Sequence, residues 1–160
     1  MESEPPLAFV IPGASWSIRV SAGAVALMNG HRQRRWHQRE TVGQLFSSDL
    51  TAATICITEA TVLTRVKSSR ASVTFDPEEA DEQRAVKLQE GLYCVGLWHT
   101  HPEANPRPSR TDEQLASDHA VVARCVLNGL CFIIVGTAEP PDGWYFGVHD
   151  GRSFHATKHL

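Results

Sequence analysis

The chain has 160 residues, of which 42% are hydrophobic and 21% charged, and its formal charge at pH 7 is -3. This length suffices for one domain with a buried core, so we expect residues 1–160 to form a single domain. The composition is that of a soluble globular protein, and the negative net charge argues against a nucleic-acid or membrane partner. No apolar run approaches the roughly 18 residues of a membrane span. The acidic start MESEPPLAFVIPG also lacks the basic end of a signal peptide, so we expect a cytoplasmic location.

The cysteine pattern indicates thiols rather than a metal or disulfide framework. Each cysteine lies among apolar residues, and none belongs to a C-x-x-C pair: Cys56, Cys94, Cys125 and Cys131. That spacing is typical neither of a zinc ribbon nor of a small secreted domain. We therefore expect buried free thiols in a reducing compartment.

The first half of the chain alternates short strands with one helix. Segments rich in β-branched and aromatic residues predict strands at 7–11, 16–20, 41–46, 52–58 and 70–75. Ser21 is a good N-cap for a helix that ends near Gly30. The turn-prone SSD between the third and fourth of these strands predicts that they form a β-hairpin.

The second half begins with a helix and a buried strand. PEEADEQRAVKLQE (77–90) starts with proline, carries acids in its first turn and is followed by Gly91, as is typical of a helix. LYCVGLW (92–98) is almost entirely apolar and predicts a strand that runs directly into His99.

A helix and two closing strands complete the predicted order. Residues 111–129 predict a helix with an acidic start and a glycine stop, and 131–137 and 144–150 predict strands. Strands and helices in this mixed order, with hairpins among them, predict an α+β fold, namely an α/β sandwich with a mixed sheet. The chain contains neither G-x-G-x-x-G nor a P-loop motif, so the sequence gives no support for nucleotide binding.

Potential metal ligands gather in WHTHPEANPRPSRTD (98–112). Residues two apart on a strand face the same side, so His99 and His101 can address one metal ion. Asp112 suits the start of the next helix and could also turn back to that metal. With a water, these three side chains would fill a tetrahedral catalytic zinc site. The alternative is that the histidines lie on a rim and Asp112 is part of a helix cap.

The sequence is consistent with two roles for Ser109. Its hydroxyl could cap the helix that begins at Arg110 or Thr111. It could also donate a hydrogen bond to the oxyanion of a tetrahedral intermediate. The two roles are compatible in one residue.

The spacing H-T-H-P, six residues, S-R-T-D resembles the signature H-x-H-P-x6-S-x-x-D of the JAMM (MPN+, Mov34/PAD-1) zinc metalloproteases. The segment from Glu40 to Phe46, ETVGQLF, is similar to the family's strand motif E-x-x-G. The resemblance extends over residues 15 to 150. It implies the JAMM/MPN fold, in which helices flank a mixed, curved β-sheet as in cytidine deaminases.

The resemblance also implies a mechanism. One Zn²⁺ per chain is held by His99, His101 and Asp112 and binds a water. Glu40 takes a proton from that water and delivers it to the leaving amine, and Ser109 helps to hold the oxyanion.

Other glutamates compete with Glu40 for the role of general base. Three of them lie near the end of a predicted element or within the proline-rich loop: Glu59, Glu90 and Glu103. We favour Glu40 because it enters a buried strand and matches the family motif. The remaining histidines of the second half are expected to be surface or structural residues: His119, His149, His155 and His159.

The segments RETVGQLF, SSRASVTFDP and GLYCVGLWHTHPE are most similar to a bacterial branch of the family, associated with E1- and E2-like enzymes in anti-phage or mobile-element operons. That similarity implies an isopeptidase or peptidase that cleaves after the C-terminus of a ubiquitin-like protein, in deconjugation or in precursor processing. E1- and E2-like proteins of the same operon are then possible partners. Two alternatives stay open: a non-catalytic MPN scaffold, and a JAMM hydrolase acting on a sulfur-carrier protein or a small amide.

Overall fold

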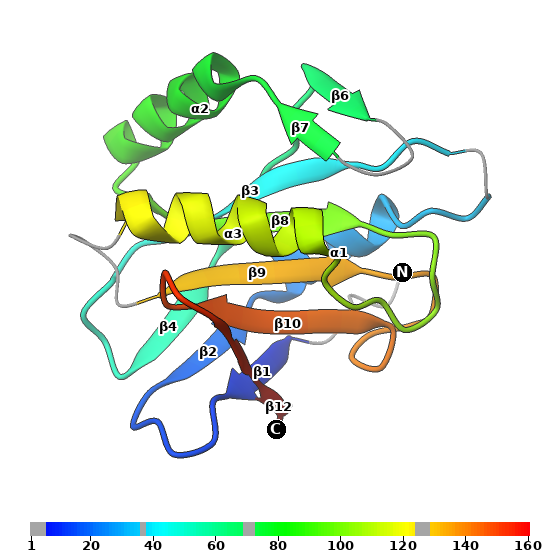
Figure 1. The fold of residues 1–160 in the computed structure, drawn as a ribbon. Coiled ribbons are helices and arrows are strands. Elements are labelled where there is room, and N and C mark those ends of the chain that lie inside the picture. Colours follow the sequence, from blue (N-terminus) through cyan, green and yellow to red (C-terminus); the bar gives the residue numbers. More distant parts are fainter. Residues whose placement is uncertain (1–5, 36–37, 69–72, 124–128) are drawn as a thin grey trace.

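The computed structural model describes residues 6–35, 38–68, 73–123 and 129–160, which form three helices and three β-sheets (Figure 1). The helices are α1 (Ala22–Gly30), α2 (Pro77–Gln89) and α3 (Arg110–Ala123). The largest sheet has the order β11-β10-β9-β8-β3-β5, with bounds Phe154–Ala156, Trp144–His149, Leu130–Val135, Tyr93–Thr100, Val42–Ser47 and Glu59–Ala60. The second sheet has the order β12-β1-β2-β4, with bounds Lys158–His159, Leu7–Val10, Ser17–Val20 and Thr54–Ile57. The third sheet pairs β6 (Val66–Ser68) with β7 (Val73–Phe75).

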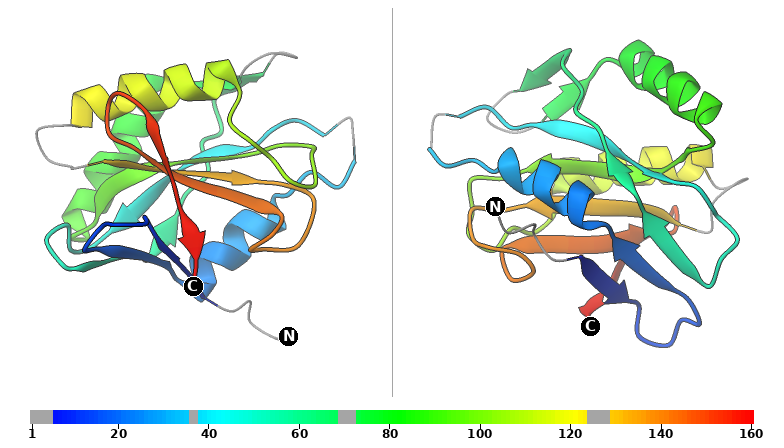
Figure 2. Two further views of the ribbon diagram at one scale, coloured as in Figure 1. Left: turned by 60° about the horizontal axis from the view of Figure 1, so that its bottom comes forward. Right: turned by 180° about the vertical axis from the view of Figure 1, so that it is seen from behind.

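The six-stranded sheet lies between two layers (Figure 2). On one face α3 packs through Ala116 against apolar side chains of the sheet such as Phe132. The main core lies on the other face, where the four-stranded sheet and α1 contribute Phe9 and Met28 and the large sheet contributes Trp98. The mixed sheets and flanking helices confirm the predicted α+β class.

Helix boundaries agree with the capping signals in the sequence. Ser21 caps α1, because its Oγ accepts a hydrogen bond from the Ala24 N–H at 3.1 Å. Asp76 caps α2 in the same way, and Gly91 follows that helix with a φ of 79°, a left-handed conformation that favours glycine. The predicted helix over 111–129 is confirmed as α3 up to Ala123, and 124–128 lie outside the described residues.

The predicted hairpin between 41–46 and 52–58 is wrong. The chain does turn back after β3, but β4 pairs in parallel with β2, in the other sheet. Only the short β5 that follows pairs with β3, through Leu45 opposite Ala60. Local turn chemistry correctly indicated the reversal, whereas the partner of β4 is β2, a strand remote in sequence whose backbone pairs with it from Ser17 opposite Thr54 to Val20 opposite Ile57. Four short strands were not predicted: β5, β6, β11 and β12.

The expectation of buried cysteines holds only in part. Cys131 is buried, and burial raises the pKa of its thiol to about 12, so it stays protonated at neutral pH. Cys94 is half-buried, while Cys56 is exposed because it faces outward from β4, an edge strand of the smaller sheet. Cys125 lies outside the described residues.

Among the described residues, no helix has the length and apolar character that crossing a membrane requires.

Candidate metal centre

The positions of His99 and His101 are fixed by the strands that pair with β8 on both of its edges. His99 lies opposite Val42 of β3 in antiparallel register and beside Ile134 of β9 in parallel register. The strand extends through Thr100, further than predicted, and the His101 N–H still donates to the Val135 carbonyl at 2.9 Å. Because side chains alternate along a strand, both imidazoles face the side of the sheet that carries α3.

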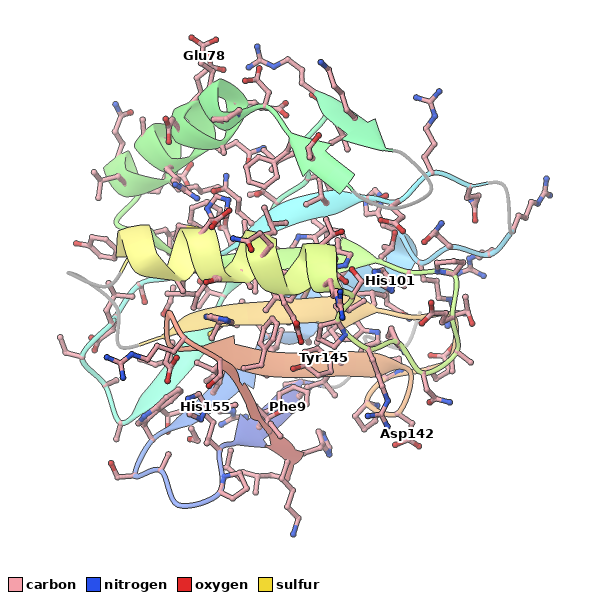
Figure 3. All side chains as sticks on the ribbon, viewed as in Figure 1. Phe9, Glu78, His101, Asp142, Tyr145 and His155 are labelled. Atoms are coloured by element: carbon pink, nitrogen blue, oxygen red, sulfur yellow. The ribbon has the colours of Figure 1, made fainter. Side chains whose placement is uncertain are left out.

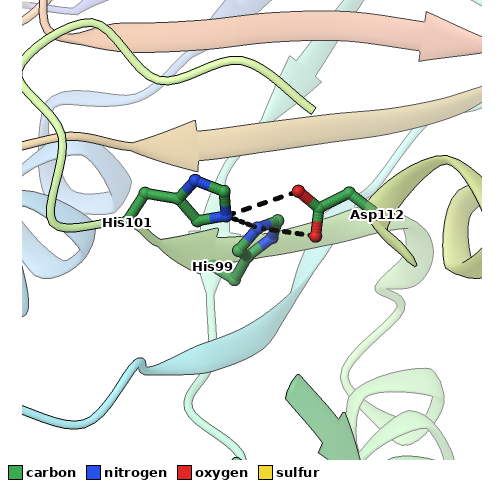
Figure 4. A group of neighbouring side chains, drawn as sticks. All are labelled: His99, His101 and Asp112. Carbon is green, nitrogen blue, oxygen red and sulfur yellow. Dashed lines mark hydrogen bonds and ion pairs between the residues drawn. The ribbon is translucent and has the colours of Figure 1, made fainter. Parts of the chain in front are cut away.

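The histidines meet an aspartate from the first turn of α3 (Figure 4). The two Nε2 atoms are 2.9 Å apart, and they lie 3.2 Å (His99) and 3.3 Å (His101) from the nearer Asp112 oxygen. Zinc–ligand bonds of about 2.0–2.1 Å would place neighbouring atoms of a tetrahedral site roughly 3.3–3.4 Å apart. The spacing of these donor atoms therefore fits one metal ion.

All three side chains are shielded from solvent. His99 is 3% exposed, and His101 and Asp112 are each 9% exposed. Burial opposes ionisation of Asp112, but hydrogen bonds from His101 and His99 outweigh it and lower the pKa of the carboxyl. The ligand set thus combines two imidazoles with a carboxylate that stays ionised, which is a donor chemistry that zinc accepts.

Ser109 and Asp112 hold each other at the start of α3. The Ser109 N–H donates to Asp112 Oδ2 at 2.8 Å, and the Asp112 N–H donates to Ser109 Oγ at 3.1 Å. This reciprocal cap orients the carboxylate toward the histidines. It accounts for Ser109 as a helix cap. In that bond the hydroxyl oxygen only accepts, so its hydrogen is still available to a ligand.

Glu40 directly precedes β3 and lies at the edge of the same site. Thr41 and Thr100 exchange two hydrogen bonds of 2.9 Å, and the pairing of Val42 with His99 places Glu40 opposite His101. Burial raises the pKa of Glu40, although the positive charges of His101 and His99 act against the shift. The structure therefore brings Glu40 into the electrostatic range of the histidines.

The rival glutamates are placed differently. Lys87 forms ion pairs with both Glu59, at 2.5 Å, and Glu90, at 3.1 Å. Glu103 lies beside the site, but its carboxylate is 61% exposed and is 4.0 Å from His101 Nδ1, the ring nitrogen that points away from the other ligands. Of the four glutamates, Glu40 is the one that is both half-buried and near the ligands.

Close packing around β3 explains why position 43, three residues after Glu40, is a glycine. A Cβ atom at this position would lie 1.7 Å from the Thr61 carbonyl oxygen and 2.4 Å from Trp98 Nε1. The indole N–H of Trp98 donates to that same carbonyl at 2.8 Å. Gly43 therefore lets three segments come together directly beneath the site.

Gly136 has a similar role, which was not predicted from the sequence. The proline-rich loop docks on the end of β9, where the Thr137 N–H donates to the Glu103 carbonyl at 2.9 Å. A Cβ atom on Gly136 would lie 2.5 Å from that carbonyl oxygen and 2.6 Å from Pro106 Cδ. The glycine that ends the apolar run FIIVG was a visible signal for this close approach.

The cluster is the one such group of three or more histidine, cysteine or acidic residues found within the described ranges. A family model for prokaryotic homologs of the JAB domain matches residues 25–147, which contain the histidines, Asp112, Ser109 and Glu40. The chain belongs to this family. Its JAB/MPN membership agrees with the fold and with the predicted JAMM resemblance.

Solved structures also resemble this JAB-family chain. A solution structure of a Desulfitobacterium hafniense protein has a TM-score of 0.59 at 19% identity, over 88% of each chain. One from Salinibacter ruber has a TM-score of 0.51 at 21% identity, over 82% of this chain and 83% of that one. A JAB1/MPN domain protein from Archaeoglobus fulgidus has a TM-score of 0.47 at 18% identity, over 82% and 90%. The first two likenesses indicate a shared fold. No curated protein matches the chain.

Proposed function

We propose that the protein is a zinc-dependent peptidase or isopeptidase that cleaves after the C-terminus of a ubiquitin-like protein. The observation that supports this most strongly is the convergence of His99, His101 and Asp112 beside Glu40. Three protein ligands leave one position of a tetrahedral zinc open, as catalytic rather than structural sites do. A half-buried carboxylate next to that position is what general base catalysis requires.

Each side chain has a defined task in this proposal. Zinc, held by the two histidines and Asp112, would polarise the scissile carbonyl and make a water more acidic. Glu40 takes a proton from the attacking water and later gives it to the leaving amine, and its raised pKa suits both transfers. Ser109 donates its free hydroxyl hydrogen to the oxyanion of the tetrahedral intermediate. The helix cap keeps Ser109 and Asp112 in register with each other.

The substrate side of the proposal rests on the similarity to the bacterial branch. The substrate is a ubiquitin-like protein joined to a target or to a C-terminal extension, and E1- and E2-like proteins of the same operon are the proposed partners. In the two alternatives the enzyme would also break an amide bond. A small amide, however, lacks the ubiquitin-like fold, and a sulfur-carrier protein lacks the conjugated target. A cleavage assay can therefore separate these classes.

A cleavage assay on a fusion tests the proposal. The substrate carries the C-terminal tail of a ubiquitin-like protein joined to a reporter protein, and the enzyme is used as purified, after chelation, and after zinc is restored. We expect cleavage at the end of the tail that is lost on chelation and returns with zinc. Glu78→Gln, on the exposed start of α2, serves as a matched control for Glu40→Gln and should cleave at the wild-type rate (Figure 3).

Three results would contradict the proposal. A chain that binds zinc yet leaves the fusion intact, even with the E1- and E2-like proteins present, would favour a scaffold. Cleavage of small amides but not of the fusion would favour the small-molecule alternative. Cleavage that persists in the chelated protein would exclude metal-dependent hydrolysis.

A further inference from the structure

A groove lies between α3 and the turn that joins β10 to β11. These two segments lie side by side in Figure 2, left. Its volume is about 620 Å³. One wall is the exposed side of α3, and the other is formed by the end of β10 and the start of β11. The residues that matter here are Arg110, Glu113 and Ser117 on the first wall and His149, Arg152 and Phe154 on the second.

The groove carries two arginines without an acidic partner. Neither Arg110 nor Arg152 forms an ion pair with any residue in the part of the chain that the structure describes. The carboxylate of Asp150, in the same turn, already has partners. Its Oδ2 lies 2.8 Å from His155 Nε2, and its Oδ1 accepts a hydrogen bond from the backbone N–H of Arg152 at 2.7 Å. Glu113 is the groove's one acidic lining residue, and its charge acts on Tyr145 and His149.

His149 adds a hydrogen-bond donor to this basic lining. Its side chain is 3% exposed, and its Nδ1 accepts a hydrogen bond from the Gly151 N–H at 3.0 Å. An imidazole that accepts at Nδ1 carries its hydrogen on Nε2 when neutral. Among the described residues Nε2 has no hydrogen-bond partner, and it is not one of the buried unpartnered atoms, so it is accessible to a ligand. The groove therefore offers two guanidinium groups and an N–H that lack acceptors from the protein.

The groove and the metal centre share the start of α3, which carries both Arg110 and Asp112. Arg110 directly follows Ser109, and the lining residues at 110, 113 and 117 follow one side of α3. At about 1.5 Å per residue, this side is roughly 10 Å long, which is the length of about three residues of extended peptide. Tyr145 and Phe154 lie next to each other on the sheet side, with ring centroids 5.9 Å apart.

We propose that this groove binds an acidic segment of the peptide substrate. Carboxylates on the same side of the scissile bond as the start of α3 would meet Arg110 and Arg152 and accept a hydrogen bond from His149 Nε2. The position relative to the scissile bond rests on the proposed peptidase function, whereas the preference for an acidic peptide rests on the groove alone. The protein as a whole has a net charge of -3, which disfavours the binding of acidic peptides elsewhere on its surface. The two arginines would therefore direct an acidic peptide to this groove.

A binding experiment without turnover tests the proposal. Two fluorescein-labelled peptides of equal length, one with three aspartates and one with asparagines in their place, are titrated into the full chain carrying Glu40→Gln. We expect the acidic peptide to bind about tenfold more tightly, because each exposed ion pair contributes about two- to fivefold. Arg110→Gln and Arg152→Gln should each remove part of the preference, and the double variant all of it. Arg19→Gln, an exposed arginine on β2, is the matched control and should change nothing.

The outcomes separate this proposal from the proposed function. Equal binding of the two peptides, or a preference that survives in the double variant, overturns the groove assignment even if the fusion is cleaved. An acidic preference that depends on both arginines supports it even if no fusion is cleaved. Where cleavage is observed, the arginine variants should raise KM for an acidic substrate and leave kcat unchanged.

Discussion

At the scale of single residues, the metal site is defined by the positions of a few donor atoms, namely the Nε2 atoms of the two histidines and the carboxylate oxygens of Asp112. The sequence spacing was enough to predict that His99, His101 and Asp112 could share one ion, because strand alternation and a helix start are local features. It was not enough to place Glu40. That carboxylate reaches the site through the pairing of β3 with β8, whose paired residues Val42 and His99 lie far apart in sequence.

Replacing Glu40 by glutamine should remove catalysis and leave the metal in place. We expect a fall in kcat/KM of roughly 10²- to 10⁴-fold, because an amide cannot take the proton of the attacking water. Zinc content should stay unchanged, since Glu40 is not among the three clustered donors. A variant that retains wild-type activity would exclude Glu40 as the general base.

The pH dependence gives a second test of the same residue. The base must be ionised, and burial raises the Glu40 pKa above the ordinary value of 4.5. Activity should therefore rise with pH through this elevated pKa and fall as the pH is lowered below it. Measuring kcat/KM against pH should show that acidic limb in the wild type. If the same limb persists in Glu40→Gln, it belongs to another group.

At the scale of elements, the capping and turn residues predicted most boundaries, but not the strand partners. The reversal after β3 was visible in SSD, yet β4 joined β2 because parallel pairing depends on strands that are distant in sequence. The same limit applies to Gly43. The E-x-x-G motif indicated the glycine, whereas the reason for it, the crossing of Thr61 and Trp98, required the three-dimensional structure.

Gly43→Ala should destabilise the protein far more than an alanine on an open surface. The new Cβ atom would collide with the Thr61 carbonyl and the Trp98 indole, so we expect the free energy of unfolding to fall by roughly 2–4 kcal/mol. Gly23→Ala, in the first turn of α1 with nothing within 4 Å of its Cβ, is the control and should be neutral or stabilising. Chemical denaturation measures both. Equal stabilities of the two variants would contradict the proposed close approach.

At the scale of the whole molecule, two sheets share one core and the metal centre lies on the opposite face of the larger sheet. Phe9 of β1 stacks on Phe146 of β10, with centroids 4.2 Å apart and the rings within 10° of parallel. Composition and pattern predicted the α+β class, because apolar alternation and helix caps recur along the chain. They did not predict that the strands would divide between two sheets, since that depends on which apolar faces meet.

Phe9→Ala should therefore weaken the whole fold without altering the metal site directly. Removing a ring that is 4% exposed leaves a cavity between the sheets, and we expect a loss of about 3–5 kcal/mol of unfolding free energy. Tyr93→Ala, at a side chain that is 43% exposed, should cost less than about 1 kcal/mol. Thermal and denaturant unfolding compare the two. Similar losses in both variants would mean that the sheets do not share the core described above.

The central claim is that His99, His101 and Asp112 form a zinc site, and the zinc content of the purified chain tests it most directly. We predict one zinc per chain in the wild type, a zinc-dependent rise in Tm of the metal-free protein, and the loss of both in His99→Ala and Asp112→Ala. A folded wild-type chain that binds no zinc and gains no stability from it would contradict the account and favour a non-catalytic scaffold.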